Sequence, residues 1–190
     1  MKTLTRKDFE PLDPPYGLMD SLGEFRGTVI DILNLQQILP EEKIWLITRP
    51  AILKENTLRL LSVQWAKHVE YLMDDSRSIE ALRVAEKYAL NKATKKELKN
   101  AWHLASTVNH TYYEDQAVAN LAANTALEDF NGETAEEIAI DAAFAFGKAC
   151  IPYHVLVYNA DPRSANSLGI DDAEEMQIQA AIEIIKKYEK

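Results

Sequence analysis

Several features are scarce in this sequence, and each absence excludes a class of protein. The 190 residues include a single cysteine, Cys150, so an intramolecular disulfide framework is impossible. No run of 18 apolar residues occurs, which leaves no candidate transmembrane helix. No apolar stretch follows the basic residues of the N-terminus, so we expect no secretory signal. Together these absences predict a soluble protein of the reducing cytoplasm that does not bind membranes.

Signals for β-strands are also scarce, and the β-prone run is short, at residues 155–158. Elsewhere apolar residues recur at spacings of three and four, the period of one helix face. We therefore predict an all-α fold, a single compact bundle of about seven helices. Prolines before residue 19 argue against a helix there. Residues 1–19 are predicted to form an extended N-terminal arm, and residues 20–190 the helical domain.

Capping residues predict where the helices begin and end. The first helix is expected from Asp20 toward Leu33, and another from Ser76 to Asn91. Capping boxes at Thr94–Glu97 and Thr134–Glu137 each predict a helix start. Residues 159–169 are predicted as a loop, after which Asp171 begins the last helix with acids at its positive dipole end. The predicted core includes Leu61, Trp65, Leu82, Tyr88, Leu98 and Trp102.

Basic residues are missing from one long stretch of this acidic chain, whose formal net charge is −9. Between Ala101 and Gly147 there is no Lys or Arg, although eight acids lie there. One interpretation is ordinary solvation together with helix-start chemistry. The functional interpretation is a face that meets a basic protein, because such a field speeds association and selects partners. The predicted partner contacts are Tyr112, Tyr113, Glu114, Asp115, Glu128, Asp129, Glu133, Glu136, Glu137 and Asp141.

A second candidate site is a stripe that His103, His110 and Glu114 form on one predicted helix. Histidine and glutamate at this spacing can share a metal ion, although the spacing names no further ligand. The plainer interpretation is a half-exposed polar flank. The sequence contains no Walker loop, dinucleotide-binding glycine pattern, HExxH motif or CxxC pair. We therefore predict no catalytic residues, no metal site and no cofactor, and expect a protein that is not an enzyme.

Residues 76–102 read SRSIEALRVAEKYALNKATKKELKNAW. This segment resembles the all-α immunity-protein family of bacterial polymorphic toxin systems, and the likeness extends over roughly residues 36–127. The matching residues are Arg77, Ser78, Ala81, Leu82, Val84, Ala85, Glu86, Tyr88, Ala89, Ala93, Thr94, Glu97 and Leu98. The chain departs from the pattern where Asn91 replaces a glycine, and where polar residues dilute the alanine-rich helix that follows.

The resemblance implies a protein that binds and silences a cognate toxin. A nuclease toxin needs a basic surface to hold phosphates, and an acidic inhibitor would compete for that surface without binding nucleic acid itself. We therefore expect a non-catalytic inhibitor of a basic effector. Two alternatives stay open beside the metal-binding protein or enzyme: a phage or mobile-element inhibitor of a host defence nuclease complex, and a scaffold that forms a homo-oligomer.

Overall fold

The computed structural model describes residues 1–49, 52–108, 123–127, 129–143, 145 and 162–189, and for residues 162–169 it describes the backbone alone. The helices and strands are β1 (Leu4–Thr5), η1 (Arg6–Asp8), η2 (Glu10–Leu12), α1 (Leu18–Leu22), β2 (Arg26–Gly27), α2 (Val29–Leu33), α3 (Pro40–Thr48), α4 (Glu55–Lys67), η3 (Glu70–Leu72), α5 (Ser76–Ala89), α6 (Lys95–Ala105), a helix at residues 132–143, and α9 (Pro162–Tyr188). Helices dominate the described residues, which confirms the predicted all-α fold.

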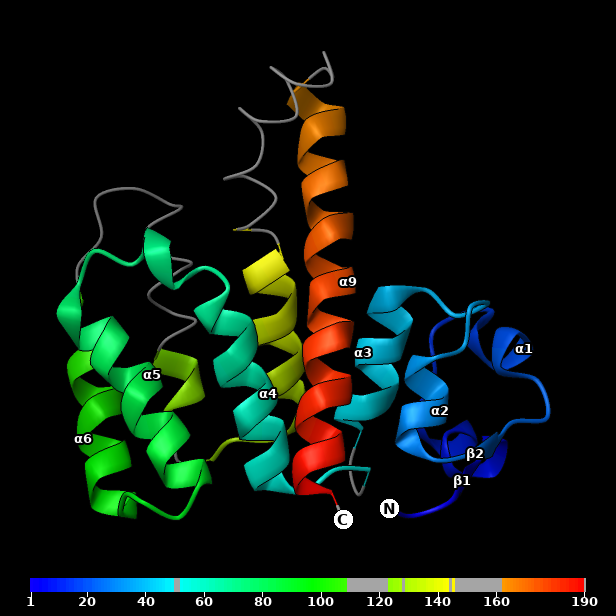
Figure 1. Cartoon of the computed structure of the whole chain (residues 1–190), viewed down its shortest axis with the longest axis horizontal. Helices are drawn as coiled ribbons and strands as arrows, with labels where there is room; N and C mark the ends of the chain where they lie inside the picture. Colours follow the sequence, from blue (N-terminus) through cyan, green and yellow to red (C-terminus); the bar gives the residue numbers. More distant parts are fainter. Residues whose placement is uncertain (50–51, 109–122, 128, 144, 146–161, 190) are drawn as a thin grey trace.

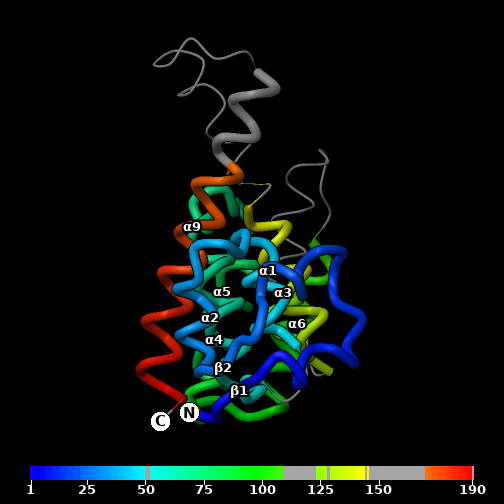
Figure 2. The backbone as a smooth tube through the Cα atoms, turned by 90° about the vertical axis from the view of Figure 1, so that its right-hand side faces the viewer, coloured from blue at the N-terminus to red at the C-terminus, as the bar shows by residue number. Residues whose placement is uncertain are grey.

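The helices are arranged around α4 and α9, which stand side by side in the middle of the molecule (Figure 1). The α5–α6 pair lies to one side of this centre, and α1, α2, α3 and the two-stranded sheet lie to the other. The N- and C-termini lie near each other at one end of the molecule in both views (Figures 1 and 2). Within the described residues, no helix is long and apolar enough to cross a membrane.

The N-terminal segment is folded rather than extended along its length. Leu4 and Thr5 pair antiparallel with Gly27 and Arg26, and two short 3-10 helices follow. Leu4 and Phe9 are fully buried in the main core, because the turns bring these apolar side chains back onto the body of the protein. The chain from residue 1 to residue 19 is therefore continuous with the helical domain.

The single helix expected from Asp20 to Leu33 is broken into two. The first part, α1, ends at Gly23, whose φ of 57° places it in the left-handed region that glycine adopts without strain. The second part, α2, begins after Thr28, whose side chain and that of Asp31 form a capping box. The strand β2 occupies the interval, and its pairing with β1 replaces the expected helical turns.

The central helix α4 carries the largest buried side chains. Trp65 is fully buried, and its indole Nε1 donates a hydrogen bond to the backbone oxygen of Gln177 on α9. Arg59 is also fully buried, and its guanidinium donates to the carbonyl oxygens of Thr125 and Leu127 at 2.7 and 2.9 Å. The same guanidinium lies 4.4 Å from the ring centre of Phe130. Arg59 thus anchors Thr125, Leu127 and Phe130 to the core.

The two helices of the α5–α6 pair begin and end near the predicted residues. Ser76 is the first residue of α5, and Asn91 follows the helix in a left-handed conformation with φ of 58°. The Thr94–Glu97 capping box is present at the start of α6. Of the six predicted core residues, Leu61, Trp65, Leu82 and Leu98 are buried. Tyr88 and Trp102 are only partly buried against the core, because they lie at the margin of the helix pair.

The helix at residues 132–143 does not begin at the predicted Thr134–Glu137 capping box. Its cap is Asn131, whose Oδ1 accepts a hydrogen bond from the backbone N–H of Thr134 at 3.0 Å. Gly132 is the first helical residue, and a Cβ atom there would collide with the carbonyl oxygen of Thr48. Glycine at this position therefore lets the helix start approach the end of α3 closely.

The last helix, α9, begins at Pro162, so the loop predicted at residues 159–169 is wrong from residue 162 onward, and Asp171 is not the helix start. Proline is favoured in the first turn of a helix, and the Asn and Ser residues that follow oppose a helix only weakly. The second half of α9 buries Ile178, Ala181 and Ile185 and packs against α2, α3 and α4. These buried residues lie in the C-terminal half of α9, and the helix continues from there back to Pro162.

Candidate binding site

The predicted partner contacts divide into two groups in the structure. Tyr112, Tyr113, Glu114, Asp115 and Glu128 lie outside the described residues. Asp129, Glu133, Glu136, Glu137 and Asp141 lie on the helix at residues 132–143 or just before it. The structure therefore gathers half of the predicted set on one element. We call Asp129, Glu133, Glu137 and Asp141, which form no ion pair with the residues that the structure describes, the acidic surface.

The acidic surface is accessible along most of its length. Asp129, Glu133 and Glu137 are exposed, whereas Asp141 is half-buried. Burial raises the pKa of the Asp141 carboxyl, and the negative charge of Glu137 raises that pKa further. Ile140 lies between them with 60% of its surface exposed, so the surface combines an apolar contact with the charges.

Glu136 has a different role from its four neighbours. Its carboxylate pairs with the guanidinium of Arg49 at the end of α3, and both side chains are mostly buried. The same guanidinium lies 4.5 Å from the ring centre of Trp45 and donates to the backbone oxygen of that residue. Glu136 therefore joins the helix at residues 132–143 to α3 and is already engaged within the protein.

A second group of acids lies on α9, where sequence reasoning assigned it to helix-start chemistry. Asp171, Asp172, Glu174 and Glu175 are more than two turns from Pro162, and the stabilising effect of the helix dipole falls off within the first turn. Residues 164–185 also contain no Lys or Arg. The helix dipole therefore does not account for these acids, and a different explanation is needed.

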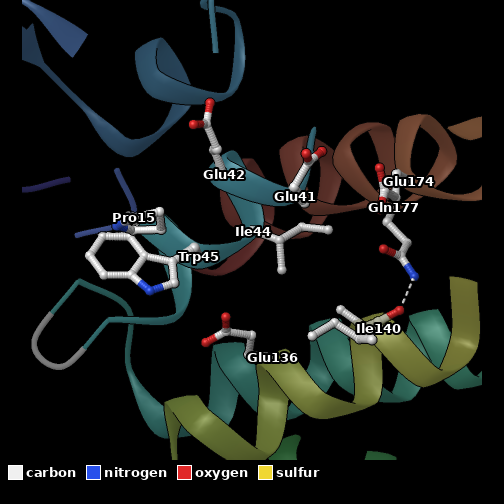
Figure 3. Close-up of a pocket in the computed structure, with 10 residues that line it drawn as sticks. Pro15, Glu41, Glu42, Ile44, Trp45, Glu136, Ile140, Glu174 and Gln177 are labelled. Carbon is white, nitrogen blue, oxygen red and sulfur yellow. Dashed lines mark hydrogen bonds between the residues drawn. The ribbon is translucent and has the colours of Figure 1, made fainter. Parts of the chain in front are cut away.

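One of these acids, Glu174, lines a pocket between three helices (Figure 3). The pocket has a volume of about 290 Å³ and lies between α3, the helix at residues 132–143, and α9. Four of its lining residues are glutamates, from all three helices. The lining residues are Pro15, Glu41, Glu42, Ile44, Trp45, Glu136, Ala139, Ile140, Glu174 and Gln177. We call this the acidic pocket.

Glu174 has the most perturbed carboxyl of the acidic pocket. Burial above all, together with the negative charges of Glu41, Asp171 and Glu175, raises its pKa from the usual 4.5 to about 7. A hydrogen bond with Glu41 acts in the same direction, because it favours the protonated carboxyl. Near neutral pH this group is therefore divided between its neutral and charged forms.

The stripe considered for metal binding is only partly described. His103 is exposed on α6, while His110 and Glu114 lie outside the described residues. Among the residues that the structure describes, no cluster of three or more His, Cys, Asp or Glu side chains could hold a metal ion. The described residues thus add no ligands to this stripe.

Sequence reasoning missed the contributions of α3 and of Gln177 to the site. Glu41 and Glu42 were assigned to no site, since an acidic pair in a first helical turn is ordinary. A signal was present in α9, because four acids in the middle of a helix without nearby bases are unusual. That signal could be recognised only with the correct helix start at Pro162, because a start at Asp171 places the same acids in the first turn.

Comparison with protein-family models, curated proteins and solved structures finds no match for this chain.

Proposed function

We propose that this protein is a non-catalytic, acidic interaction protein that binds and inhibits a basic effector protein in the cytoplasm, as an immunity-type inhibitor does. The observation that carries the proposal is the acidic surface, which exposes carboxylates on and just before a helix that buries Ala135, Ile138, Ala139 and Ala142 in the core. The resemblance of residues 76–102 to immunity proteins is a second, independent support.

The electrostatics of the site support a binding role over plain solvation. Burial and, after it, neighbouring negative charges raise the pKa of both Asp141 and Glu174, so folding brings these carboxyl groups close to other carboxylates. Keeping a protein surface solvated does not need such clusters, because separate acids interspersed with basic residues serve equally well. A basic partner would relieve the repulsion, so part of the binding free energy would come from charges that the fold already holds together.

Inhibition by such a surface requires only occlusion. A nuclease-type effector holds phosphates with clustered Lys and Arg side chains, and these would face the acidic surface in a complex. The carboxylates of Glu133 and Glu137 lie one helical turn apart, so one partner surface can meet both. The partner's substrate, which is also an anion, would then be excluded from the same basic surface.

The test is association kinetics between the purified chain and the product of a neighbouring gene, measured across a series of salt concentrations. Asp129, Glu133 and Glu137 are changed together to Lys. Electrostatic steering raises association rates by about 10- to 1000-fold, so the triple variant should associate at least about 10-fold more slowly at low salt. Its salt dependence should also be weaker, because fewer charge pairs are screened.

The matched control changes three exposed acids outside the site, Glu24, Asp74 and Glu80, to Lys. It makes the same change in net charge and should retain most of the association rate. Equal slowing in both triple variants would show that only net charge matters, and no slowing in the site variant would assign the acidic surface to solvation. Either result refutes the proposed role of these residues.

A further inference from the structure

We propose that the acidic pocket binds an organic cation, namely the alkylammonium or alkylguanidinium end of a lysine-like or arginine-like ligand. If the cation is a Lys or Arg side chain of the basic partner, the inference deepens the proposed function and rests on it. A free amine has the same chemistry and would use the same pocket.

The first support is an unpaired acceptor at the inner end of the pocket. Gln177 is buried, with 1% of its surface exposed, and its side-chain Nε2 donates to the carbonyl oxygen of Ala139 at 2.8 Å. A carbonyl only accepts hydrogen bonds, so this contact fixes which end of the amide is nitrogen. The Oε1 atom must therefore face the other way, and it is buried without a hydrogen-bond partner among the described residues.

Figure 3 shows this oxygen turned toward the space between Ile44 and Ile140, while the amide nitrogen reaches the backbone of the helix at residues 132–143. Buried polar atoms in native proteins are almost always hydrogen-bonded, and an acceptor is satisfied only by a donor. Gln177 thus offers an acceptor to a ligand that carries N–H or O–H groups into the pocket.

The second support is the set of carboxylates that line the pocket together with Gln177. Glu41 and Glu174 come from α3 and α9 and lie close enough for a hydrogen bond between their carboxyl groups. Glu42, the next residue of α3, also lines the pocket, although its carboxylate is turned away from the other two in Figure 3. Ionised carboxylates only accept hydrogen bonds, whereas an ammonium offers three donors and a guanidinium five. The acceptor set is therefore complementary to these two groups and repels anions.

The third support is the apolar remainder of the pocket. Ile44, Trp45, Ala139 and Ile140 supply a lining suited to methylene groups, because Lys and Arg stems bury along apolar surface while their heads stay polar. A volume of about 290 Å³ exceeds what one metal ion fills. Among the described residues, no three carboxylates converge closely enough to hold a metal ion. The combination favours an organic cation over an inorganic one.

Binding should be coupled to the ionisation of Glu174. The charged groups that act on it are Glu41 from α3 and Asp171 and Glu175 from α9 itself, and the pocket also carries Glu42 of α3 and Glu136 with its partner Arg49. With a pKa of about 7, Glu174 is mostly neutral at pH 6 and mostly ionised at pH 8. A cation prefers the ionised form, so its affinity should rise about tenfold across this interval and level off above it.

The experiment titrates the full chain with agmatine and with n-butylammonium by isothermal calorimetry at pH 6 and pH 8, with 1-butanol as the neutral probe. We expect both cations to bind at millimolar concentration or below, about tenfold more tightly at pH 8, and 1-butanol to bind far more weakly. Glu174→Gln should weaken binding about tenfold at pH 8 and remove the pH dependence. Glu183→Gln, at an exposed position of the same helix, should leave both unchanged.

The outcomes separate the pocket from the proposed function. Agmatine that binds and competes with the basic partner identifies a partner side chain as the ligand, and agmatine that binds without competing identifies a free amine. Absence of binding by both cations at pH 8, or equal binding by Glu174→Gln, overturns the inference even if the partner still associates through the acidic surface. If agmatine binds as expected but partner association does not depend on salt concentration, only the proposed function is refuted.

Discussion

Glu174→Gln should stabilise this protein, and the gain should depend on pH. The wild-type carboxyl has a folded-state pKa of about 7 against an ordinary value of 4.5, so the folded state holds the proton more tightly than the unfolded state. The contribution of Glu174 to stability is therefore greatest below about pH 4.5, falls as the pH rises toward and through 7, and is constant above that. Gln resembles the protonated carboxyl at every pH and should escape this loss.

The size of the gain follows from the two pKa values. Each pH unit between them corresponds to about 1.4 kcal/mol, so the full difference would be about 3 kcal/mol. Glu174 is only half-buried, and solvent screening of its neighbours reduces the expected gain to about 1–2 kcal/mol at pH 8. At pH 4 the carboxyl is largely protonated in both states, and the gain should be close to zero.

The assay is urea denaturation followed by far-UV circular dichroism at pH values from 4 to 8, for wild type, Glu174→Gln and Glu183→Gln. Glu183 is exposed on the same helix, so its change to Gln controls for the removal of a charge from α9. A gain that stays constant with pH, or a loss of stability at pH 8, would show that Glu174 does not carry the burial and repulsion assigned to it.

Three further substitutions test the packing around the site. Gly132→Ala should destabilise by about 2 kcal/mol or more in denaturant unfolding, because the new methyl group meets the backbone oxygen of Thr48; an unchanged midpoint would contradict the close approach. Asn131→Ala should cost about 1 kcal/mol through loss of the helix cap, whereas Asn131→Asp, which retains a capping oxygen, should cost less. Trp65→Ala should cost about 3–5 kcal/mol, and Trp102→Ala distinctly less, since only Trp65 is fully buried; similar losses at both positions would mean that the core is wrongly placed.

Local sequence determined the elements whose boundaries depend on neighbouring residues. The α5–α6 pair is the clearest case, because a serine start, a left-handed Asn91 and the Thr94–Glu97 box all act within a few residues. Apolar spacing likewise identified Leu61, Leu82 and Leu98 as buried. Charge counting located the acids of the helix at residues 132–143, since the absence of Lys and Arg is a property of the sequence itself.

Tertiary structure decided the features that depend on distant partners. The helix α9 begins at Pro162 despite the weak local preference of Asn and Ser for turns, and its buried residues Ile178, Ala181 and Ile185 lie near its other end, where they join the main core. Glu136 is engaged by Arg49, 87 residues away, so its sequence neighbours do not reveal that it is paired. The acidic pocket needs Glu41, Glu174 and Gln177 from helices that are remote in sequence. Such a site exists only after folding, because hydrogen bonds and charge repulsion depend on distances in space that spacing along the chain does not determine.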